Sequence, residues 1–254
     1  MRTLRLPDEF RLVEMDEVDS TNEEAKRLAC SGVADGTLVW AHSQTAGRGR
    51  RGRVWMSDPG NLYTSFVLRP DCAPLQAAQL TFVAALAVRD MLTTFLDNCD
   101  SIACKWPNDV LVGGRKISGI LLESSTAGGG IVDWLVLGIG VNLRHHPDIG
   151  GRHPATNLSA EGAGAIEVSS ALETLATAFA KRRREWFQGG FEAVRNAWLK
   201  HAYGLGKAAH FKLEGADHSG LFIGIDESGA LRLKGDGCAE QLFTAGEVTF
   251  EGSG

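Results

Sequence analysis

The sequence predicts an α+β fold in which a mixed, mostly antiparallel sheet with helices is followed by a small all-β domain. In the first part of the chain, strand-like segments alternate with stretches of helical periodicity. One of these stretches, Leu75–Leu96, is rich in Ala and Leu and indicates a buried helix. After Gly204-Leu205-Gly206 the helical periodicity ends, and short strands separated by Gly-rich turns follow. We therefore expect a large domain over residues 1–204 and a small β-barrel domain over residues 205–254.

The first part of the large domain predicts three strands, a helix and a long loop. The strands are Arg11–Val18, Thr37–His42 and Leu62–Leu68. The helix begins at Ser20-Thr21-Asn22 and runs to Cys30, and either Ser20 with Glu23 or Thr21 with Glu24 fits a capping box. The segment Gln44–Gly60 is polar and glycine-rich and predicts a loop. Loops of this length inside a compact domain are usually functional.

The remainder of the large domain predicts a turn, a hairpin and further helices. A short strand at Ser101–Lys105 leads into the turn Trp106-Pro107-Asn108-Asp109. Gly113-Gly114 then joins two strands as a hairpin, Val110–Val112 and Arg115–Glu123. The elements expected after it are a strand at Ile131–Leu143, a loop at residues 144–166, and helices at Val168–Phe187 and Phe191–His201.

The composition is that of an ordinary globular protein. The 254 residues are 44% hydrophobic, and 31 acidic against 26 basic side chains give a net charge of −5. A disordered chain would have fewer apolar residues and more net charge, and a chain that coats DNA would not be acidic. We expect no run to be apolar enough to cross a bilayer, and residues 1–10 mix Arg, Asp and Glu, unlike a signal peptide. We therefore expect a cytoplasmic protein without membrane association.

The five cysteines are odd in number and show no C-x-x-C spacing. This pattern does not favour a disulfide framework or a structural zinc site. We expect free thiols that are buried as small hydrophobic side chains.

Residues 47–53 read Gly-Arg-Gly-Arg-Arg-Gly-Arg in an otherwise acidic protein. Glycines let backbone N–H groups approach a ligand closely, and arginines make bidentate contacts with phosphate and carboxylate. The combination suits a polyphosphate with a carboxylate beside it, although a solvated basic loop or an RNA contact has the same composition. Because its charges repel one another, we expect this loop to order only around an anion.

A second motif, Lys105-Trp106-Pro107-Asn108-Asp109, stands just before the predicted hairpin. The hairpin would return Lys116 close to this turn. A lysine can hold a carboxylate and a phosphate together as a point charge, and Asp109 could hold a lysine or help to place a metal ion. Taken alone, the motif is equally typical of a structural turn.

Three glycines interrupt the predicted strands. Gly119 indicates the close approach of a ligand or another backbone, or else a β-bulge. Gly138 and Gly140 alternate along one strand and remove the side chains from one of its faces. The resulting slot would accept a fused-ring ligand with an aliphatic tail.

Two further features favour structural explanations. The basic run Lys181–Arg184 is typical of a solvated helix face, because Glu185 and the apolar Trp186 follow it directly. His145, His146 and His153 share one loop, but no metal-ligand spacing supports a site there.

Together, in order and in spacing, the motifs resemble those of the biotin protein ligase family. They are Ser20-Thr21-Asn22, residues 44–55, Lys105–Asp109, Arg115–Leu121 and Gly138–Asn142. The resemblance covers the large domain and, more weakly, the C-terminal one, where Gly246-Glu247-Val248 resembles a family segment near the nucleotide. It implies a class II aminoacyl-tRNA-synthetase-like catalytic domain followed by an SH3-like barrel. The implied reaction has two steps: biotin and ATP give biotinyl-5′-AMP and pyrophosphate, and a carrier-protein lysine then displaces AMP.

The resemblance also implies residue roles, with Lys116 and Arg50 as the catalytic residues. The residues expected to bind biotin are Ser20, Thr21, Asn22, Gln44, Gly47, Arg48, Gly49, Arg50, Arg51, Trp55, Lys116, Gly119, Leu121, Gly138 and Gly140. Those expected to bind ATP or the adenylate are Arg48, Arg50, Arg51, Arg53, Trp55, Lys105, Asn108, Lys116 and Asn142. Mg²⁺ would accompany ATP, with Asp109 as the residue that helps to hold it through the phosphates. No tightly bound prosthetic group is expected.

The implied acceptor is a biotin carboxyl carrier protein, the carrier subunit of acetyl-CoA carboxylase or a related carboxylase, and a homodimer is compatible with the family. Some members carry an N-terminal helix-turn-helix domain and repress transcription. Here the first strand begins near Arg11, so we expect a monofunctional ligase without specific DNA binding.

Three alternatives remain open: a lipoate or octanoate ligase of the same fold, an RNA-binding module that uses the Arg/Gly loop, and an inactive biotin sensor. The Gly47–Arg53 loop and the Lys105–Asp109 turn favour biotin over the other acids. The presence of Lys116 and Arg50 argues against a sensor.

Overall fold

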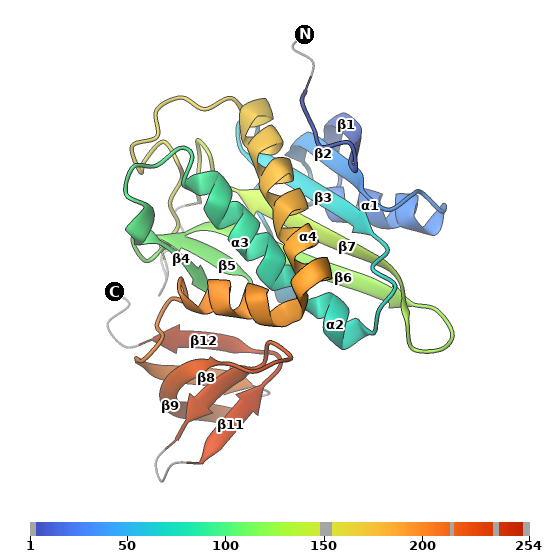
Figure 1. Cartoon of the computed structure of the whole chain (residues 1–254). Helices are drawn as coiled ribbons and strands as arrows, with labels where there is room; N and C mark the ends of the chain where they lie inside the picture. Colours follow the sequence, from blue (N-terminus) through green and yellow to red (C-terminus); the bar gives the residue numbers. More distant parts are fainter. Residues whose placement is uncertain (1–3, 148–153, 214–215, 236–238, 251–254) are drawn as a thin grey trace.

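The chain forms a seven-stranded sheet with helices and a separate five-stranded sheet, in a computed structural model that describes residues 4–147, 154–213, 216–235 and 239–250 (Figure 1). The first sheet has the spatial order β1 (Arg11–Val18), β2 (Thr37–Gln44), β3 (Leu62–Leu68), β7 (Val132–Val141), β6 (Arg115–Thr126), β5 (Asp109–Val112) and β4 (Ile102–Lys105). Among these strands β1 and β2 pair in parallel, and the other neighbours are antiparallel. This confirms the mixed, mostly antiparallel sheet.

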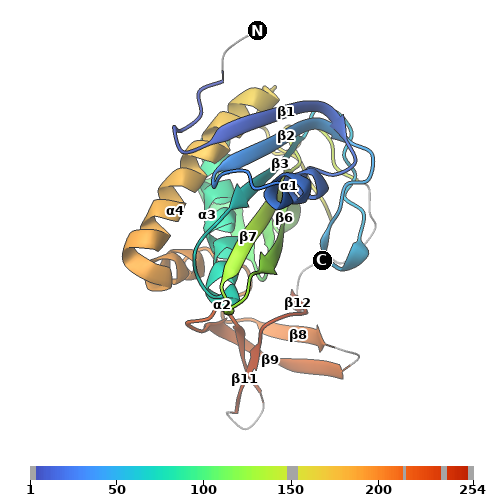
Figure 2. The same ribbon diagram turned by 90° about the vertical axis from the view of Figure 1, so that its right-hand side faces the viewer.

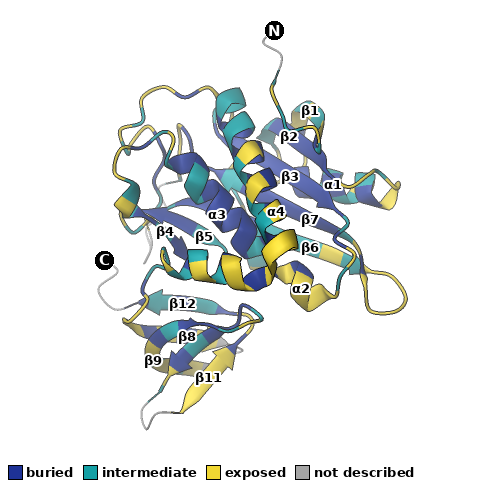
Figure 3. Cartoon of the chain, viewed as in Figure 1, coloured by how far each residue is buried: buried dark blue, intermediate teal, exposed yellow. Residues whose placement is uncertain are grey.

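Helices cover both faces of this sheet (Figure 2). On one face, α1 (Thr21–Cys30) packs Ala25 and Ala29 against small buried side chains of β2, β3 and β7. On the opposite face lie α2 (Pro74–Ala78), α3 (Leu80–Leu92) and α4 (Val168–Leu199). The exposed residues of α4 lie on its outer side (Figure 3).

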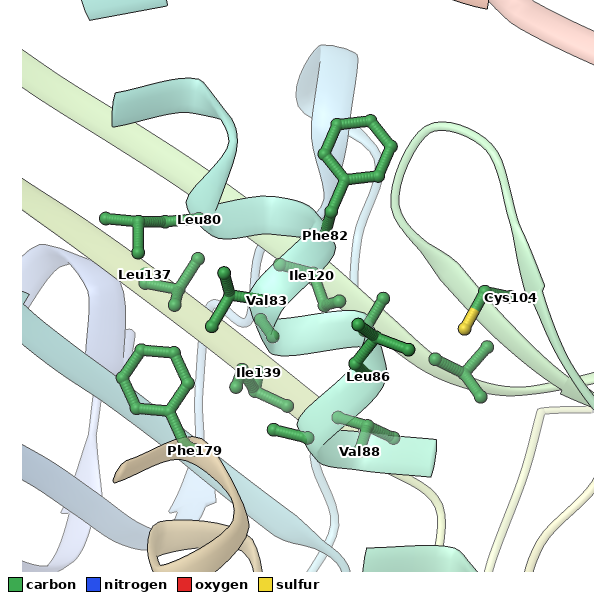
Figure 4. Close-up of a cluster of buried hydrophobic side chains, with 14 of the residues drawn as sticks. Leu80, Phe82, Val83, Leu86, Val88, Cys104, Ile120, Leu137, Ile139 and Phe179 are labelled. Atoms are coloured by element: carbon green, nitrogen blue, oxygen red, sulfur yellow. The ribbon is translucent and has the colours of Figure 1, made fainter. Parts of the chain in front are cut away.

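The main core lies between α3, α4 and the sheet (Figure 4). Leu137 and Ile139 of β7 point into it, beside Val83 and Leu86 of α3. Because side chains alternate along a strand, the even-numbered positions of β7, including Gly138 and Gly140, belong to the face that carries α1. The predicted glycine face is therefore separated from the main core by the sheet itself.

One helix boundary differs from the expectation, and another agrees with it. The apolar stretch 75–96 is divided into α2 and α3 at Gln79, whose side-chain carbonyl accepts a hydrogen bond from the Trp186 indole N–H at 3.0 Å. The two helices expected at 168–187 and 191–201 lie within α4, which a kink at Gly190 (φ 66°, ψ −170°) divides into two helical parts. This backbone geometry is not helical, and glycine adopts it without the strain that a side chain would add.

The prediction of a capping box at the start of α1 is wrong. Ser20 stands at the N-cap position, but no side chain caps the helix. Glu23 forms ion pairs with Lys26 (2.7 Å) and with Arg48 instead. The Thr21 side chain contacts Gln44 and Ser65. Thr21 and Glu23 thus contact distant segments, and Glu24 pairs with Arg27 within the helix.

The basic run on α4 is a solvated face only in part, because Lys181 and Arg184 are exposed whereas Arg182 and Arg183 are not. Arg182 pairs with Asp90 of α3 at 2.6 Å, and Arg184 pairs with Glu9 at 2.8 Å. Arg183 is buried and pairs with Asp35 at 2.8 Å. Acidic side chains from three separate segments thus hold α4 on the sheet, and these acids are distant in sequence.

The expectation of buried thiols holds for Cys104 alone among the described cysteines. Cys30 is exposed, and Cys72 and Cys99 are partly buried; all four are free. Cys238 lies outside the described residues. The segment Pro74–Leu92 is, contrary to expectation, long and apolar enough to cross a membrane, but most of it is buried inside the protein as in a core helix.

The second sheet has the order β11 (Glu240–Phe243), β10 (Leu231–Lys234), β9 (Ala216–Ile225), β8 (Ala208–Leu213) and β12 (Glu247–Phe250), and its paired strands are antiparallel. It packs against the large domain near the turn after β4. There the Trp106 indole N–H donates to the Gly229 carbonyl at 3.0 Å. Phe211 and Phe222 join the main core, so this sheet is fixed beside the first one.

Candidate active site

A cavity of about 880 Å³ lies on the α1 side of the first sheet and extends to β8 and β12 of the second. It is lined by the start of α1, the loop after β2, strands β5, β6 and β7, and the C-terminal strands. The predicted site residues that line it are Ser20, Thr21, Asn22, Gln44, Arg48, Gly49, Arg50, Arg51, Arg53, Trp55, Lys105, Asn108, Asp109, Lys116, Gly119, Leu121, Gly138, Gly140 and Asn142. Five separate motifs therefore meet at one place.

Gly47 is the predicted site residue that does not line the cavity. Its carbonyl accepts a hydrogen bond from the Trp55 backbone N–H at 2.9 Å. A side chain at Gly47 would overlap the Trp55 carbonyl and the Ser57 hydroxyl. The glycine is required by the packing of the loop behind the cavity wall.

Lys116 returns to the turn that precedes the hairpin, as predicted. Its Nζ lies 2.7 Å from Asp109 Oδ1, so the carboxylate holds the lysine in place. Asn108 occupies the same turn, donates from Nδ2 to the Ile120 carbonyl at 2.7 Å, and accepts at Oδ1 from Arg50 Nη1 at 2.9 Å. The turn thus brings the guanidinium of Arg50 and the ammonium of Lys116 to the same wall.

Trp55 lies on the glycine face of the sheet. Gly119 and Gly140 are direct neighbours across β6 and β7. A Cβ atom would lie 2.9 Å from the indole at Gly119 and 2.6 Å from it at Gly140. Lys116 Nζ lies 5.4 Å from the centre of the same ring. The indole occupies part of the predicted slot and supplies an apolar wall beside the lysine, which favours an aliphatic group there.

The arginine loop is anchored at both ends by acidic side chains. Arg48 pairs with Glu23 of α1, and Arg53 Nη2 lies 2.6 Å from Glu247 Oε2 of β12. The hydrogen bond from Arg53 lowers the pKa of Glu247 below its ordinary value. These pairs offset part of the repulsion among the arginines. The expectation that the loop orders only around an anion stays a prediction.

Lys105, at the end of β4, is a buried cation at this site. Its side chain is only 5% exposed, and burial lowers its pKa to about 8. The nearby charges of Asp109 and Glu247 oppose this shift. An anion such as phosphate that binds beside a buried ammonium of this kind stabilises its charged form.

Asn142 supports the cavity from the end of β7. Its buried Nδ2 donates to the Thr156 carbonyl at 3.0 Å. The Thr156 N–H in turn donates to the Lys116 carbonyl at 2.8 Å. The amide therefore holds residues 154–158 against the strand that carries the lysine.

The polar end of the cavity contains a buried network that includes a residue outside every motif, Ser65 of β3. Ser65 Oγ lies 2.9 Å from Thr21 Oγ1 and 2.7 Å from Asn22 Oδ1. Gln44 Oε1 accepts from the Thr21 backbone N–H at 2.8 Å. The sequence signal that could have identified Ser65 is a pair of hydroxyl residues, Thr64-Ser65, inside an otherwise apolar strand.

Other lining residues also lie outside the motifs or at their weak edge. The second sheet contributes His210, Lys212, Asp217, Glu247 and Thr249. Of these, Glu247 belongs to the segment whose resemblance is weak. The others give no pattern in the sequence, because their place at the cavity depends on how the second sheet packs.

The residues present do not make a metal site formed by protein side chains alone. Within the described ranges, no group of three or more His, Cys, Asp and Glu side chains could hold a metal ion. Asp109 is already paired with Lys116. His145 and His146 are part of no such group, and His153 lies outside the described residues.

Comparison with known proteins gives the family. Residues 15–142 match the biotin/lipoate A/B protein ligase family, and residues 204–250 match the biotin protein ligase C-terminal domain. The chain is 45% identical to the biotin–[acetyl-CoA-carboxylase] ligase of Paracoccus denitrificans, over 92% of this chain and 98% of the relative. It is 34% identical to the bifunctional ligase/repressor BirA of Bacillus subtilis, over 92% of this chain and 72% of the relative.

Comparison with solved structures gives the same family. The biotin protein ligase of Aquifex aeolicus in complex with biotin and ATP matches with a TM-score of 0.80 at 29% identity, over 94% of this chain and 98% of that one. The apo structure of the same protein matches with a TM-score of 0.77 at 25% identity, over 95% and 98% of the two chains. The chain therefore belongs to the biotin/lipoate A/B protein ligase family and carries its biotin protein ligase C-terminal domain.

Proposed function

We propose that this protein is a biotin protein ligase, which makes biotinyl-5′-AMP from biotin and ATP and then biotinylates a lysine of a carrier protein. The observation that carries the proposal is the meeting of Lys116, Arg50 and Lys105 with an apolar wall and a polar end in one cavity. The 45% identity to the biotin–[acetyl-CoA-carboxylase] ligase of Paracoccus denitrificans supports it.

The first step brings two anions together. A biotin carboxylate oxygen attacks the α-phosphorus of ATP, the bond to the bridging oxygen breaks, and pyrophosphate leaves with that electron pair. Lys116, held by Asp109, can contact both the carboxylate and the α-phosphate. Arg50 and the buried Lys105 add positive charge where negative charge gathers in the transition state.

Mg²⁺ bound to the nucleotide phosphates would supply further charge neutralisation. The donor set fits a cation that the phosphates carry, with Asp109 as the acidic side chain nearest to Lys116 and the turn. It does not fit a cation held by the protein alone.

The second step needs no covalent bond to the enzyme. The neutral amine of the acceptor lysine attacks the acyl carbon of the mixed anhydride, AMP leaves with the bridging oxygen, and the amine nitrogen loses a proton. Water would compete for the same carbon, so closure of residues 47–53 over the adenylate would protect it. The ion pairs Arg48–Glu23 and Arg53–Glu247 are the contacts that hold this loop over the cavity.

The geometry supports one orientation of the substrates. The ureido ring would lie at the polar end beside Ser20, Thr21 and Gln44, with the aliphatic tail along Trp55. The nucleotide would lie toward Lys105, Asn108 and Asn142, where the second sheet completes the cavity wall. Of the remaining predicted ligand residues, Arg51 and Leu121 line the same cavity.

We further propose the finer features that the family resemblance implies. The large domain would be class II aminoacyl-tRNA-synthetase-like and the C-terminal domain an SH3-like barrel, with the boundary after residue 204. The acceptor would be the biotin carboxyl carrier subunit of acetyl-CoA carboxylase, and the enzyme would act in the cytoplasm without binding specific DNA. A homodimer is compatible with this reading.

Pyrophosphate exchange into ATP tests the proposal and separates it from its alternatives. We expect exchange that depends on biotin and is not supported by lipoate or octanoate. Exchange that lipoate or octanoate supports and biotin does not would show that the protein is a lipoate or octanoate ligase. RNA binding that weakens with salt and ignores biotin and ATP, together with no exchange for any acid, would establish an RNA-binding module instead.

A further inference from the structure

Asn22 is buried at the start of α1, with both ends of its side-chain amide occupied. Its Nδ2 donates to Glu123 Oε2 at 2.9 Å and faces the Leu121 carbonyl at 3.4 Å. A carboxylate and a carbonyl only accept hydrogen bonds, so the amide nitrogen must face them. The amide oxygen then faces Ser65 Oγ at 2.7 Å. Because that oxygen only accepts, Ser65 donates its single hydroxyl proton to it.

Glu123 fixes the orientation of this amide because it remains a carboxylate. Burial alone would raise the pKa of Glu123. Hydrogen bonds from Asn22 and from Lys26, which lies 3.0 Å from Oε1, hold the pKa below its ordinary value. The charged oxygen opposite Asn22 therefore has no proton to donate at neutral pH.

The direction of the next hydrogen bond follows from proton counting. Ser65 Oγ lies 2.9 Å from Thr21 Oγ1. Since the Ser65 proton is committed to Asn22, a hydrogen bond in this contact must use the Thr21 proton. Among the residues that the structure describes, the other acceptor bonded to Thr21 Oγ1 is Gln44 Oε1, at 3.1 Å, and it already accepts from the Thr21 backbone N–H.

Both positions for the Thr21 proton are thus inside the protein, while Thr21 itself lines the cavity. A hydroxyl has one proton and two lone pairs. With its proton directed inward, Thr21 keeps a lone pair for a ligand. The polar end of the cavity then accepts a hydrogen bond at this position and does not donate one.

We propose that Glu123 and Ser65 are positioning residues that set the direction of this hydrogen-bond chain, so that Thr21 presents an acceptor to a ligand N–H group. The inference rests on the proposed function, because the ureido ring of biotin carries two N–H groups. Lipoate and octanoate carry none. The chain of hydrogen bonds therefore makes selection of a ureido ring a property of β3 and β6 as well as of the residues that touch it.

A binding experiment tests the direction of the bond separately from its strength. The ligands are biotin and two cyclic carbamate analogues, each with one ureido N–H replaced by a ring oxygen, titrated calorimetrically into the full chain without ATP. In the unmodified protein we expect one analogue to bind about 30-fold more weakly than biotin, since its oxygen would face a lone pair. The quantity compared among variants is the ratio of the affinity for biotin to the affinity for this analogue. Thr21→Val removes the acceptor and therefore gives the ratio that remains when the contact is absent.

Ser65→Ala is the informative variant. Without the Ser65 oxygen, the Thr21 proton keeps only Gln44 Oε1 as an inward acceptor, at the longer distance of 3.1 Å and already bonded to the Thr21 N–H, so the proton can turn toward the ring oxygen of the analogue. We expect the ratio between biotin and that analogue to fall to about 5 or less, a change that general loosening of the site would not produce. Thr64→Val is the matched control. Thr64 is equally buried on the same strand, and its hydroxyl donates to the Val39 carbonyl at 2.8 Å, away from the cavity, so its ratio should equal that of the unmodified protein.

Glu123→Gln supplies a second variant if Ser65→Ala does not fold. A glutamine has a single acceptor oxygen, so either Asn22 or Lys26 would face an NH₂ group. The ratio should drop about threefold. Glu24→Gln removes an acidic charge from the same turn of α1 that pairs with Arg27 and not with Asn22 or Lys26, and it should leave the ratio unchanged.

The outcomes separate the inference from the proposed function. Equal loss of affinity for biotin and both analogues in Ser65→Ala would reduce Ser65 to a structural role and overturn the inference, leaving the ligase intact. So would an unmodified protein that binds biotin and both analogues equally. Absence of biotin binding by the unmodified protein would overturn the proposed function, and the inference with it.

Discussion

Gly138 of β7 is the position where a single methyl group should disturb the site most. A Cβ atom there would overlap Asn22 Oδ1 and lie 2.8 Å from Asn22 Cγ. The amide cannot move aside freely, because Ser65 and Glu123 hold its two ends at 2.7 and 2.9 Å. Displacing it breaks one neutral hydrogen bond, worth about 1 kcal/mol, and one to a charged group, worth about 2 kcal/mol. We therefore expect Gly138→Ala to lower the free energy of unfolding by about 3 kcal/mol.

Biotin affinity should fall as well, because Asn22 is adjacent to Thr21 in the first turn of α1. A drop of tenfold or more in calorimetric titration is expected, beside the shift of the urea unfolding curve. Gly128→Ala is the matched control, since its Cβ would meet open space, and it should change the unfolding free energy by less than about 0.5 kcal/mol. A Gly138→Ala protein as stable as this control, with normal biotin affinity, would refute the placement of Asn22.

Three further predictions concern a buried lysine, the arginine loop and the α4 ion pairs. The pKa of Lys105 is about 8 in the folded protein, below its ordinary 10.5. Between these pH values the unfolded chain binds more protons than the folded one, so the free energy of unfolding should rise from pH 8 to 10.5. Urea unfolding curves of Lys105→Met should lack this rise. Trypsin should cut residues 48–53 in the free protein, biotin with ATP should protect them, and Glu247→Gln should be cut faster; a loop that resists trypsin without ligand would contradict this. Asp35→Asn should cost about 1–2 kcal/mol in thermal unfolding because it leaves the buried Arg183 charge without its partner; an unchanged transition would show that this pair does not stabilise the fold.

Local sequence patterns were sufficient for the elements that build the cavity. The hairpin through Gly113-Gly114 pairs Lys116 with Leu111, two residues from Asp109, because a two-residue connection sets the register next to the turn. The irregularity after Val110 shifts Asp109 to face Gly119, and the Lys116 side chain still reaches its carboxylate. Gly138 and Gly140 lie on one face of β7 because side chains alternate along a strand. These relations lie within a few residues of one another, so short-range geometry determines them.

Relations between distant segments were not predictable in this way. Nothing near Ser65 shows that its hydroxyl meets α1, and nothing near Glu123 shows that it orients Asn22. The capping box failed for a related reason, since Glu23 meets Arg48 from a distant loop. In each case tertiary packing decides among several locally acceptable partners. The same limit applies to His210 and Lys212, whose place at the cavity depends on domain packing.

Lys116 is central to the account, because one ammonium group is required to hold the carboxylate and the α-phosphate together. The most direct measurement is biotin-dependent exchange of pyrophosphate into ATP by Lys116→Ala, with Lys181→Ala on the exposed face of α4 as a charge-matched control. The account predicts a loss of about 100-fold or more in the exchange rate of Lys116→Ala, with the control unchanged and both proteins folded. Exchange by Lys116→Ala at the unmodified rate would contradict it.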